Sequence, residues 1–396
     1  MYPNERTENL MRRIARPVAL AIALALAAGL TAARAAAADL EQVYRDALAY
    51  DATLVGARAS LEAGREKLPQ GRAGLLPSVS VSGNTTWNDA TLKYVDPQVS
   101  RGYNSHGWQA QLTQPVFRWQ NWVQYKQGEL QSAQAEAQYQ LARMDLTLRA
   151  SQAYFDVLTA QDALAAATAL REANAQQLAL AKKSFEVGTV TITDVHEAQS
   201  RYDLSSAQTI AAESDLEVRR NALAVLTGKT PDALKTLRKG VALSSPEPAD
   251  MPSWVSASEA TALQVQAAQL GVEIAAREIE RNRAGHAPTV DLVASYGNSV
   301  NPVASVTPTT NYDSRAIGLQ VAIPLYQGGG VNSRVREAIA LRDKAAADLD
   351  NARRTAAQAA RQAYLGVTSG LAQVRALEAA QVSSRSALDA NKLGYE

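Results

Sequence analysis

Phe185-Glu-Val-Gly-Thr-Val-Thr-Ile-Thr-Asp194 interrupts a long run of helix-forming residues, and this arrangement decides the fold. The run begins at Trp119, contains no proline, and is dominated by Ala, Gln, Leu, Glu, Lys and Arg. At 1.5 Å per residue, its roughly 65 residues predict a helix about 100 Å long. A second proline-free run continues to Gly228, where glycine predicts the helix end. The sequence therefore predicts a long helical hairpin, which is too polar for lipid and must stand in water.

The returning helix has the residue spacing of a helix–helix seam. Val195, Ala198, Tyr202 and Ser205 recur at intervals of three and four, as residues along a coiled-coil contact do. A plain antiparallel pair of solvent-exposed helices has the same spacing. The pattern predicts antiparallel packing in the hairpin and leaves the type of packing open.

The composition argues against several classes of function. The chain has 396 residues, of which 40 are basic and 39 acidic, so its charge gives no reason to expect a nucleic-acid partner. It has no cysteine, hence no disulfide and no thiolate metal site. His106, His196 and His286 lie far apart in the sequence, and no catalytic triad or phosphate-binding loop has supporting context. We therefore expect no metal, no cofactor and no enzymatic activity.

The first 38 residues are typical of an export signal. Three arginines at positions 12, 13 and 16 precede an apolar segment of about 13 residues at 18–30, and alanines follow at the −3 and −1 positions. We expect cleavage within residues 35–38 and a mature chain in the cell envelope; a membrane anchor is the alternative. No later run of about 18 apolar residues is present, so no transmembrane helix is predicted.

Two segments before the long helix have the period of β-strands. Residues 39–72 have a helical pattern of apolar residues. In residues 75–87, apolar residues then alternate with serine and asparagine, which predicts a strand with one apolar and one polar face. A polar loop is predicted at 88–105 and a second alternating strand at 108–116.

The whole pattern recurs about 210 residues later, which indicates an internal duplication. Arg72-Ala-Gly-Leu-Leu-Pro-Ser-Val79 is echoed by Arg283-Ala-Gly-His-Ala-Pro-Thr-Val290. Similarly, Gln114-Pro-Val-Phe117 matches Ile323-Pro-Leu-Tyr326, and Gln152-Ala-Tyr-Phe155 matches Gln362-Ala-Tyr-Leu365. The duplicated part therefore predicts two further strands and a second long helix.

The duplication sets the expected domain organisation. We expect a signal peptide at 1–38, a first repeat at 39–228, a linker or equatorial segment at 229–256 and a second repeat at 257–396. By the same offset, Tyr395-Glu396 matches Phe185-Glu186. We therefore expect the second repeat to lack its last helix and Glu396 to be an incomplete end.

Four strands with one apolar face cannot lie in lipid as an open sheet, because the two edges leave backbone groups unpaired. The strands must therefore pair with those of other copies of the chain. Three chains give an antiparallel barrel of about twelve strands with a water-filled lumen. The predicted fold class is mixed α and transmembrane β, a trimeric 12-stranded barrel continuous with a long α-helical barrel. Packing of the apolar faces as a sandwich core is the alternative.

The sequence resembles the TolC-type outer-membrane factor family. The resemblance rests on residues 185–199, on Pro115 and Pro324 at the strand exits, on the paired Gln-Ala-Tyr motifs and on Leu226-Thr-Gly228. It implies a homotrimer in the outer membrane whose helices extend into the periplasm. It also implies an exit duct for tripartite efflux or type I secretion. The implied partners are a periplasmic adaptor and an inner-membrane transporter of the ABC, RND or MFS type. Many relatives carry a lipidated cysteine that this chain lacks.

The resemblance also assigns roles to individual residues. It implies adaptor docking at the turn formed by Val187, Gly188 and Thr189, and an aperture gate that includes Asp194 and Tyr395. The resemblance implies that the gate's matching arginine and the aspartate ring of the second turn lie beyond Glu396. An aromatic cluster at the strand exits is suited to a membrane–water interface, and comprises Phe117, Trp119, Trp122 and Tyr326.

Two alternatives remain at this stage. Asp194, Glu197 and Asp203 form either a paired-carboxylate site or, more economically, a solvated helix start that the helix dipole stabilises. The chain as a whole is either the outer-membrane channel or a periplasmic adaptor with a coiled-coil hairpin. Adaptors usually carry one hairpin, whereas the duplication predicts a strand pair before each of two long helices.

Overall fold

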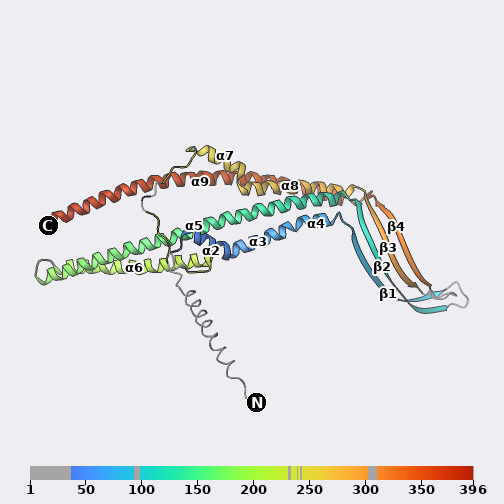
Figure 1. The fold of residues 1–396 in the computed structure, drawn as a ribbon, viewed down its shortest axis with the longest axis horizontal. Helices are drawn as coiled ribbons and strands as arrows, with labels where there is room; N and C mark the ends of the chain where they lie inside the picture. The colour runs from blue at the N-terminus through green and yellow to red at the C-terminus, as the bar shows by residue number, and fades with distance from the viewer. Residues whose placement is uncertain are drawn as a thin grey trace, which may run out of the picture. The chain divides into compact units, whose positions relative to one another are not determined.

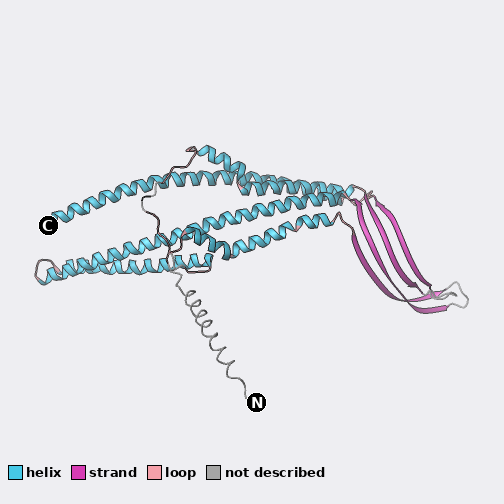
Figure 2. Cartoon of the chain, viewed as in Figure 1, coloured by secondary structure: helices cyan, strands magenta, loops and turns pink. Residues whose placement is uncertain are grey.

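The structure is a computed structural model and describes residues 37–92, 99–230, 233–238, 240, 243–301 and 310–395. The expected signal peptide at 1–38 lies almost wholly outside these residues. Most of the described chain is helical, and its four strands form one sheet (Figures 1 and 2). Within the described ranges, no helix combines the length and apolarity needed to cross a bilayer.

The chain divides into two compact units. The first comprises Met1–Val55 and Met144–Val241, and the second Gly56–Arg143 and Ala242–Glu396. The helices are α2 (Leu40–Tyr50), α3 (Ala52–Arg65), α4 (Lys67–Ala73), α5 (Trp119–Glu186), α6 (Ile192–Thr227), α7 (Met251–Thr261), α8 (Leu263–Arg283), the short η1 (Ala284–His286) and α9 (Gly330–Tyr395). The strands are β1 (Ser78–Leu92), β2 (Val99–Phe117), β3 (Thr289–Asn301) and β4 (Thr310–Ala322). The unit boundaries therefore fall within α3 and α5.

The first unit has its own apolar core. Buried residues of α2, α5 and α6 meet there with one residue of the segment after α6, and they include Val43, Tyr154, Val157, Leu158, Leu216, Leu223 and Leu234. The segment is held in place by backbone hydrogen bonds, from Ala38 N–H to Ala233 C=O at 2.9 Å and from Lys235 N–H to Ala38 C=O at 3.0 Å. The Tyr154 hydroxyl donates to the Lys235 carbonyl at 2.5 Å, so the buried polar tip of this ring is satisfied.

The helix expected at 39–72 is three helices, and Asp51 explains the first break. Its backbone ends α2, and its Oδ1 accepts a hydrogen bond from Leu54 N–H at 2.7 Å, which caps the start of α3. Arg149 of α5 donates to both Asp51 oxygens, at 3.0 and 3.3 Å. This guanidinium lowers the pKa of the Asp51 carboxyl below its ordinary value. A carboxylate that caps one helix is thus also paired to another.

The long helical hairpin agrees with the sequence prediction. Helix α5 has 68 residues, and α6 has 36 and ends one residue before Gly228, whose φ is +70°. Along α6, Val195, Thr209, Leu216 and Leu223 are buried and fall on one seven-residue repeat. That repeat is typical of coiled-coil packing, and it favours this type over a loosely exposed pair.

The four strands form an antiparallel meander in the order β1-β2-β3-β4. The loop expected at 88–105 is mostly strand: β1 continues to Leu92, β2 begins at Val99, and residues 93–98 lie outside the described chain. The prediction was wrong because side chains there are polar on both faces and bond across the hairpin. Asn88 Nδ2 donates to Ser105 Oγ at 2.9 Å, and the hydroxyls of Thr91 and Ser100 lie 2.8 Å apart.

Glycines bring α4 and α5 into backbone contact in the second unit. A Cβ on Gly71 would lie 2.9 Å from the Tyr125 Cα, and one on Gly128 would lie 2.5 Å from the Lys67 carbonyl oxygen. Real side-chain carbons do not approach so closely, so both positions require glycine. Pro69 and Gly71 both lie within α4, and the proline is tolerated because it lies in the first turn.

The second repeat was expected to begin at residue 257, but its first helix, α7, begins earlier, at Met251. Asp250 is its N-cap and accepts from Ser253 N–H, and Pro252 lies in the first turn. The expected linker at 229–256 therefore overlaps α7. A break at Ala262 separates α7 from α8, and Ser258 Oγ donates to the Ala356 carbonyl of α9 at 3.1 Å.

Candidate channel wall and helical turn

One face of the sheet is apolar along its full width. The strand register aligns Val79, Leu112, Ala294 and Ile317 in one row across the four strands. Many apolar side chains of this face are exposed, and Ile317 is 77% exposed. No second sheet covers them among the described residues, so the sandwich alternative is not supported. An exposed apolar surface of this kind needs an apolar neighbour.

The apolar face does not extend along the whole length of the strands. Trp108 and Tyr296 pack edge to face with ring centroids 5.4 Å apart. Beyond them, toward the ends of β1–β2 and β3–β4, the same face carries Asn298, Asp313 and His106, with Trp87 as an exposed aromatic side chain among these polar residues. The apolar side chains thus form a band between this polar end and the helical end of the sheet, as in lipid-facing barrel surfaces.

The opposite face is polar. One of its rows aligns Ser80, Gln111, Ser295 and Ala316 across the four strands. Gly297 lies on this face too, and a Cβ there would lie 2.6 Å from the Trp108 carbonyl oxygen, so β2 approaches β3 where only glycine fits. A surface of serine, glutamine and threonine suits the wall of a water-filled lumen.

Both outer strands of the sheet are unpaired along one edge. Strands β1 and β4 have a single neighbour each among the described strands, so one row of N–H and C=O groups in each lacks a strand partner. Strand β4 ends at Ala322, and the residues after it, including Leu325 and Tyr326, are highly exposed. The edges are the feature that makes this sheet incomplete as a membrane structure.

An ion pair fastens β3 to the start of α5. Arg118 Nε donates to Asp291 Oδ1 at 2.8 Å and Nη2 donates to Oδ2 at 2.6 Å, which is the bidentate arrangement. Asp291 is buried and lies opposite Pro115, where β2 has a bulge. Sequence analysis missed this pair, whose members are 173 residues apart. The available signal was a charged residue on the polar face near the start of a strand, directly after the duplicated motif that ends at Val290.

The four aromatic residues predicted for a membrane interface lie at the helical end of the strands. Phe117 ends β2, Trp119 and Trp122 lie in the first turns of α5, and Tyr326 follows β4. All four are exposed in the single chain. Their role at an interface stays a prediction.

Tyr125 belongs beside this cluster and was missed. Its ring centroid is 5.8 Å from that of Trp122, and Lys126 Nζ lies 5.3 and 5.5 Å from the two rings. A cavity of 470 Å³ lies against these rings and is lined by Leu68, Pro69, Arg72, Leu75, Leu76, Trp122 and Tyr125. The spacing of Trp122 and Tyr125, three residues apart in a helix, could have indicated the pair.

The turn between α5 and α6 is closed by its own backbone. Gly188 has a φ of +78° and donates to the Phe185 carbonyl at 2.9 Å, and Thr189 N–H and Oγ1 both donate to the Ser184 carbonyl at 2.9 Å. Val187 is 74% exposed at the tip. The turn therefore presents an apolar side chain on a hydrogen-bonded scaffold, and adaptor docking at Val187, Gly188 and Thr189 stays a prediction.

Asp194 caps the returning helix. Its Oδ2 accepts from Thr191 N–H at 2.7 Å and from the Thr191 hydroxyl at 2.8 Å, and Asp194 N–H donates back to that hydroxyl at 3.3 Å. These hydrogen bonds lower the pKa of the Asp194 carboxyl. Glu197 pairs with Arg201 at 2.6 Å, and Asp203 accepts from Gln199. The three carboxylates are thus engaged separately, and the helix-start interpretation fits better than a paired-carboxylate site.

The structure says less about the remaining predicted residues, which are Tyr395 and the histidines. Tyr395 is the last residue of α9, but its side chain lies outside what the structure describes, so its gate role stays a prediction. His106 lies 3.1 Å from Asn104 and His286 lies 3.1 Å from Asn332, each with one polar neighbour. No cluster of potential metal ligands occurs in the part of the chain that the structure describes.

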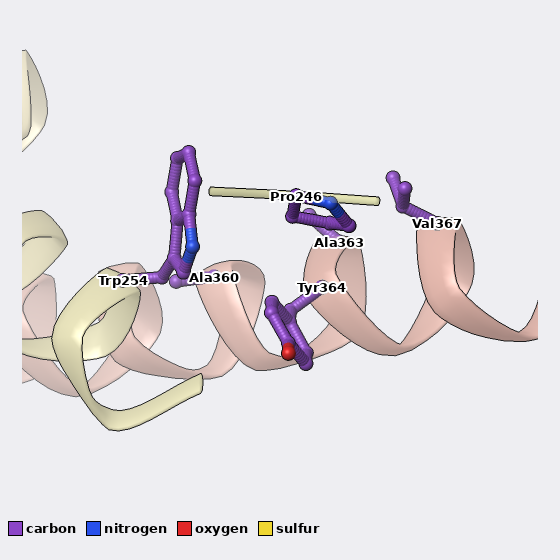
Figure 3. Close-up of a pocket in the computed structure, with 6 residues that line it drawn as sticks. All are labelled: Pro246, Trp254, Ala360, Ala363, Tyr364 and Val367. Carbon is purple, nitrogen blue, oxygen red and sulfur yellow. The ribbon is translucent and has the colours of Figure 1, made fainter. Parts of the chain in front are cut away.

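A small apolar cavity lies against α9 in the second unit. Its volume is 160 Å³, and it is lined by Pro246, Trp254, Ala360, Ala363, Tyr364 and Val367. Figure 3 shows Trp254 and Pro246 over the face of α9 that carries the other four residues. The lining has no charged side chain, so it offers no chemistry for a reaction.

Comparison with known proteins identifies the family. The model of the family described as "Outer membrane efflux protein" matches residues 43–229 and 254–396. The chain is 32% identical over 370 residues to the proteases secretion protein PrtF of Dickeya chrysanthemi, covering 90% of this chain and 79% of PrtF. It is 31% identical over 371 residues to the outer membrane protein TolC of Escherichia coli, covering 91% of this chain and 74% of TolC.

Solved structures share the fold. A membrane protein from Pseudomonas aeruginosa matches with a TM-score of 0.77 at 20% identity, over 90% of this chain and 83% of that one. The outer membrane protein VceC of Vibrio cholerae matches with a TM-score of 0.70 at 21% identity, over 87% and 82%. The family match and the relatives PrtF and TolC favour the outer-membrane channel over the alternative of a periplasmic adaptor. The chain belongs to the outer membrane efflux protein family and is an outer-membrane protein with the fold of its channels.

Proposed function

We propose that three copies of this chain form a passive exit duct across the outer membrane. The observation that carries the proposal is the sheet with one apolar face, one polar face and two unpaired edges. Closing four strands from each of three copies pairs every edge, turns the apolar faces to lipid and gives a barrel of about twelve strands around a polar lumen.

In this proposal the duct supplies a path and its partners supply the energy. The polar face offers serine, glutamine and threonine to water, as the lining of a passive water-filled path requires. An inner-membrane transporter would deliver cargo through a periplasmic adaptor. The relatives include proteins named for protease secretion and for outer-membrane efflux, which supports an export role without choosing between small molecules and proteins.

The proposed organisation follows the duplication. Residues 1–38 would direct export, the repeats 39–228 and 257–396 would each supply a strand pair and a long helix to the wall, and the segment between them would lie around its middle. Val187, Gly188 and Thr189 would receive the adaptor. Asp194 and Tyr395 would belong to the aperture gate at the far end of the helices.

Conductance in planar bilayers tests the duct and its gate together. Protein purified in detergent should insert as a trimer with a low closed-state conductance, and Asp194→Ala should raise that conductance. Thr191→Ala is the matched control, because it breaks the same capping interaction but leaves the carboxylate. An equal rise in both variants would assign the effect to helix fraying. Extraction by osmotic shock without detergent would overturn the channel itself.

Adaptor capture tests the docking turn. Val187→Asp should reduce copurification of the periplasmic adaptor at least several-fold while leaving trimers and conductance intact. Val225→Asp is a suitable control, since Val187 and Val225 are both 74% exposed and only Val187 lies in the turn. Unchanged capture by Val187→Asp would remove the turn from the docking site.

A further inference from the structure

The duplication allows the contact between neighbouring subunits to be derived residue by residue. Strand β1 corresponds to β3 at an offset of 211, from Val79 and Val290, and β2 corresponds to β4 at an offset of 209, from Phe117 and Tyr326. The β2–β3 pairing occurs within one chain. Its counterpart under the duplication is a pairing of β4 with β1, the two strands whose outer edges are free.

The two offsets can be tested inside the chain before they are used. In the first hairpin, Ser78 pairs with Thr113. The offsets convert this pair into Thr289 and Ala322, and these two residues are paired in the second hairpin. The duplication thus reproduces an observed register without adjustment, so the same offsets can be applied to the observed β2–β3 register.

We propose that β4 of one subunit pairs with β1 of a second copy in the register that places Arg315 directly opposite Asp89. This pair is the counterpart of His106 and Val300 in the β2–β3 ladder. The inference rests on the trimeric barrel proposed above and specifies how its subunits join. In each subunit, the free edge of β4 pairs with β1 of one neighbour. The free edge of β1 pairs with β4 of the other neighbour.

Charge complementarity supports this register. Arg315 is exposed, and its guanidinium lies 5.3 Å from the Tyr296 ring without an acidic partner among the described residues. Asp89 is exposed and likewise has no ion pair within the described ranges. The nearby Asp313 is already engaged, since Asn298 Nδ2 donates to it at 2.9 Å. An arginine and an aspartate that each lack a counter-charge become direct neighbours across the joint.

Slipped registers are less favourable. A slip of one residue would set the apolar face of one strand beside the polar face of the next. A slip of two residues would place Asp89 opposite Asp313, with like charges together, or opposite Ile317, with a charge against an apolar side chain. Of these neighbouring registers, only the proposed one gives Asp89 an opposite charge.

Side-chain volume also supports the proposed β4–β1 register. In the β2–β3 ladder, Gln109 lies opposite Gly297, and the space of the missing Cβ is filled by the approaching strand. The counterpart across the joint is Gly318 opposite Thr86. The glycine lies on the other strand of the pair in this case, and Gly318 has open space where a Cβ would be in the single chain, which leaves room there for Thr86 of the neighbour.

The same register extends beyond the end of β4. Phe117 is still paired, with Val290, whereas the equivalent residue Tyr326 has no strand partner in the single chain. The proposed joint gives Tyr326 a partner in Val79 of the neighbour. Residues 323–326 should therefore become strand on assembly, which explains why apolar side chains such as Leu325 are highly exposed in one chain.

Paired cysteines test the register, and the chain has none of its own to interfere. Thr85 and Leu319 are predicted to face each other across the joint, at about 4.5–5.5 Å between Cα atoms, which a disulfide can bridge. Thr85→Cys with Leu319→Cys should give covalent trimers on oxidation in outer membranes. Thr85→Cys with Ile317→Cys or with Val321→Cys, each slipped by two residues, should react at least several-fold less.

The outcomes separate this inference from the proposed function. Preferred reaction of the Thr85–Leu319 pair supports the register. Preferred reaction of a slipped pair, or no reaction while detergent-purified trimers still conduct, overturns the register and leaves the duct standing. Absence of trimers in every variant and in the unmodified protein overturns both.

Charge exchange gives a second, independent test. Asp89→Arg and Arg315→Asp each create a like-charge pair at all three joints and should lower the temperature of trimer dissociation by about 2–5 °C. The double variant restores opposite charges and should recover most of that loss. Additive losses in the double variant would show that the two residues do not meet.

Discussion

The two halves of the chain carry the same motif in different surroundings. Gln152-Ala-Tyr-Phe155 lies on α5 and Gln362-Ala-Tyr-Leu365 on α9. Tyr154 is only 4% exposed, in a core completed by α6 and by Leu234. Its equivalent Tyr364 lines an open cavity, beside a valine that is 50% exposed (Figure 3). Duplicated sequence therefore fixes which face of a helix is apolar, but not what covers it.

The helix breaks show the same contrast. The chain bends with similar backbone angles at Asp51, between α2 and α3, and at its equivalent Ala262, between α7 and α8. At the first break, the buried Asp51 is paired with Arg149. At the second, the equivalents are Ala262 and Ala359, which carry no charge. The duplicated bend is therefore held by an ion pair in one half and without one in the other.

The largest expected difference between the halves is in apolar burial. Leu223→Ala should cost about 3 kcal/mol of unfolding free energy, because the side chain is fully buried in the first core. Val367→Ala, on the open face of α9, should cost less than about 1 kcal/mol. Guanidinium unfolding of the purified protein, followed by circular dichroism, measures both. Equal losses would mean that the face of α9 is covered as completely as that of α5.

Acid should weaken the bend between α2 and α3 in the first half. Because the folded-state pKa of Asp51 is lowered from its ordinary value of 3.8, its pairing stabilises the protein above that value. This contribution is lost as the pH falls from about 5 through the lowered pKa. Asp51→Asn should cost about 2 kcal/mol near pH 7, and less as the pH falls. Urea unfolding at pH 7 and pH 3 checks this, and a cost independent of pH would contradict it.

Two glycines should respond to alanine with opposite signs. Gly228 has a φ of +70°, and an added Cβ would lie 2.6 Å from the Tyr50 ring, so Gly228→Ala should destabilise by about 1–2 kcal/mol. Gly366 lies within α9 with open space around it, so Gly366→Ala should stabilise by about 0.5–1 kcal/mol. Thermal unfolding of the two variants compares them. A loss at Gly366 would indicate a neighbour that packs against α9.

The smallest expected effect concerns the two tyrosines themselves. Tyr154→Phe removes the hydrogen bond to the Lys235 carbonyl and should cost about 1 kcal/mol. Tyr364→Phe should be nearly neutral, because its ring borders an open cavity. Denaturation midpoints of the two variants measured side by side give the comparison, and the prediction does not survive if Tyr364→Phe is the more costly.

Elements with a strong local signal could be predicted from the sequence. The long helices, the Gly228 stop and the two-faced strands follow from residue spacing alone, and all are present. The lengths of β1 and β2 could not be predicted, because their polar ends gain stability from hydrogen bonds across the hairpin. The Arg118–Asp291 pair was missed for a related reason, since it joins residues far apart in sequence. The start of helix α7 was predicted too late in the sequence because Asp250 was not recognised as its N-cap.

The unpaired edges of β1 and β4 also have a consequence for how the protein is made. A newly exported chain with both edges open would present unpaired backbone N–H and C=O groups to any other unfolded chain. A single subunit is therefore the species most prone to aggregation. Association that closes the edges removes this hazard and draws the folding equilibrium forward. The yield of correctly folded protein should therefore depend on the synthesis rate and on any chaperone that shields the strand edges until they are paired.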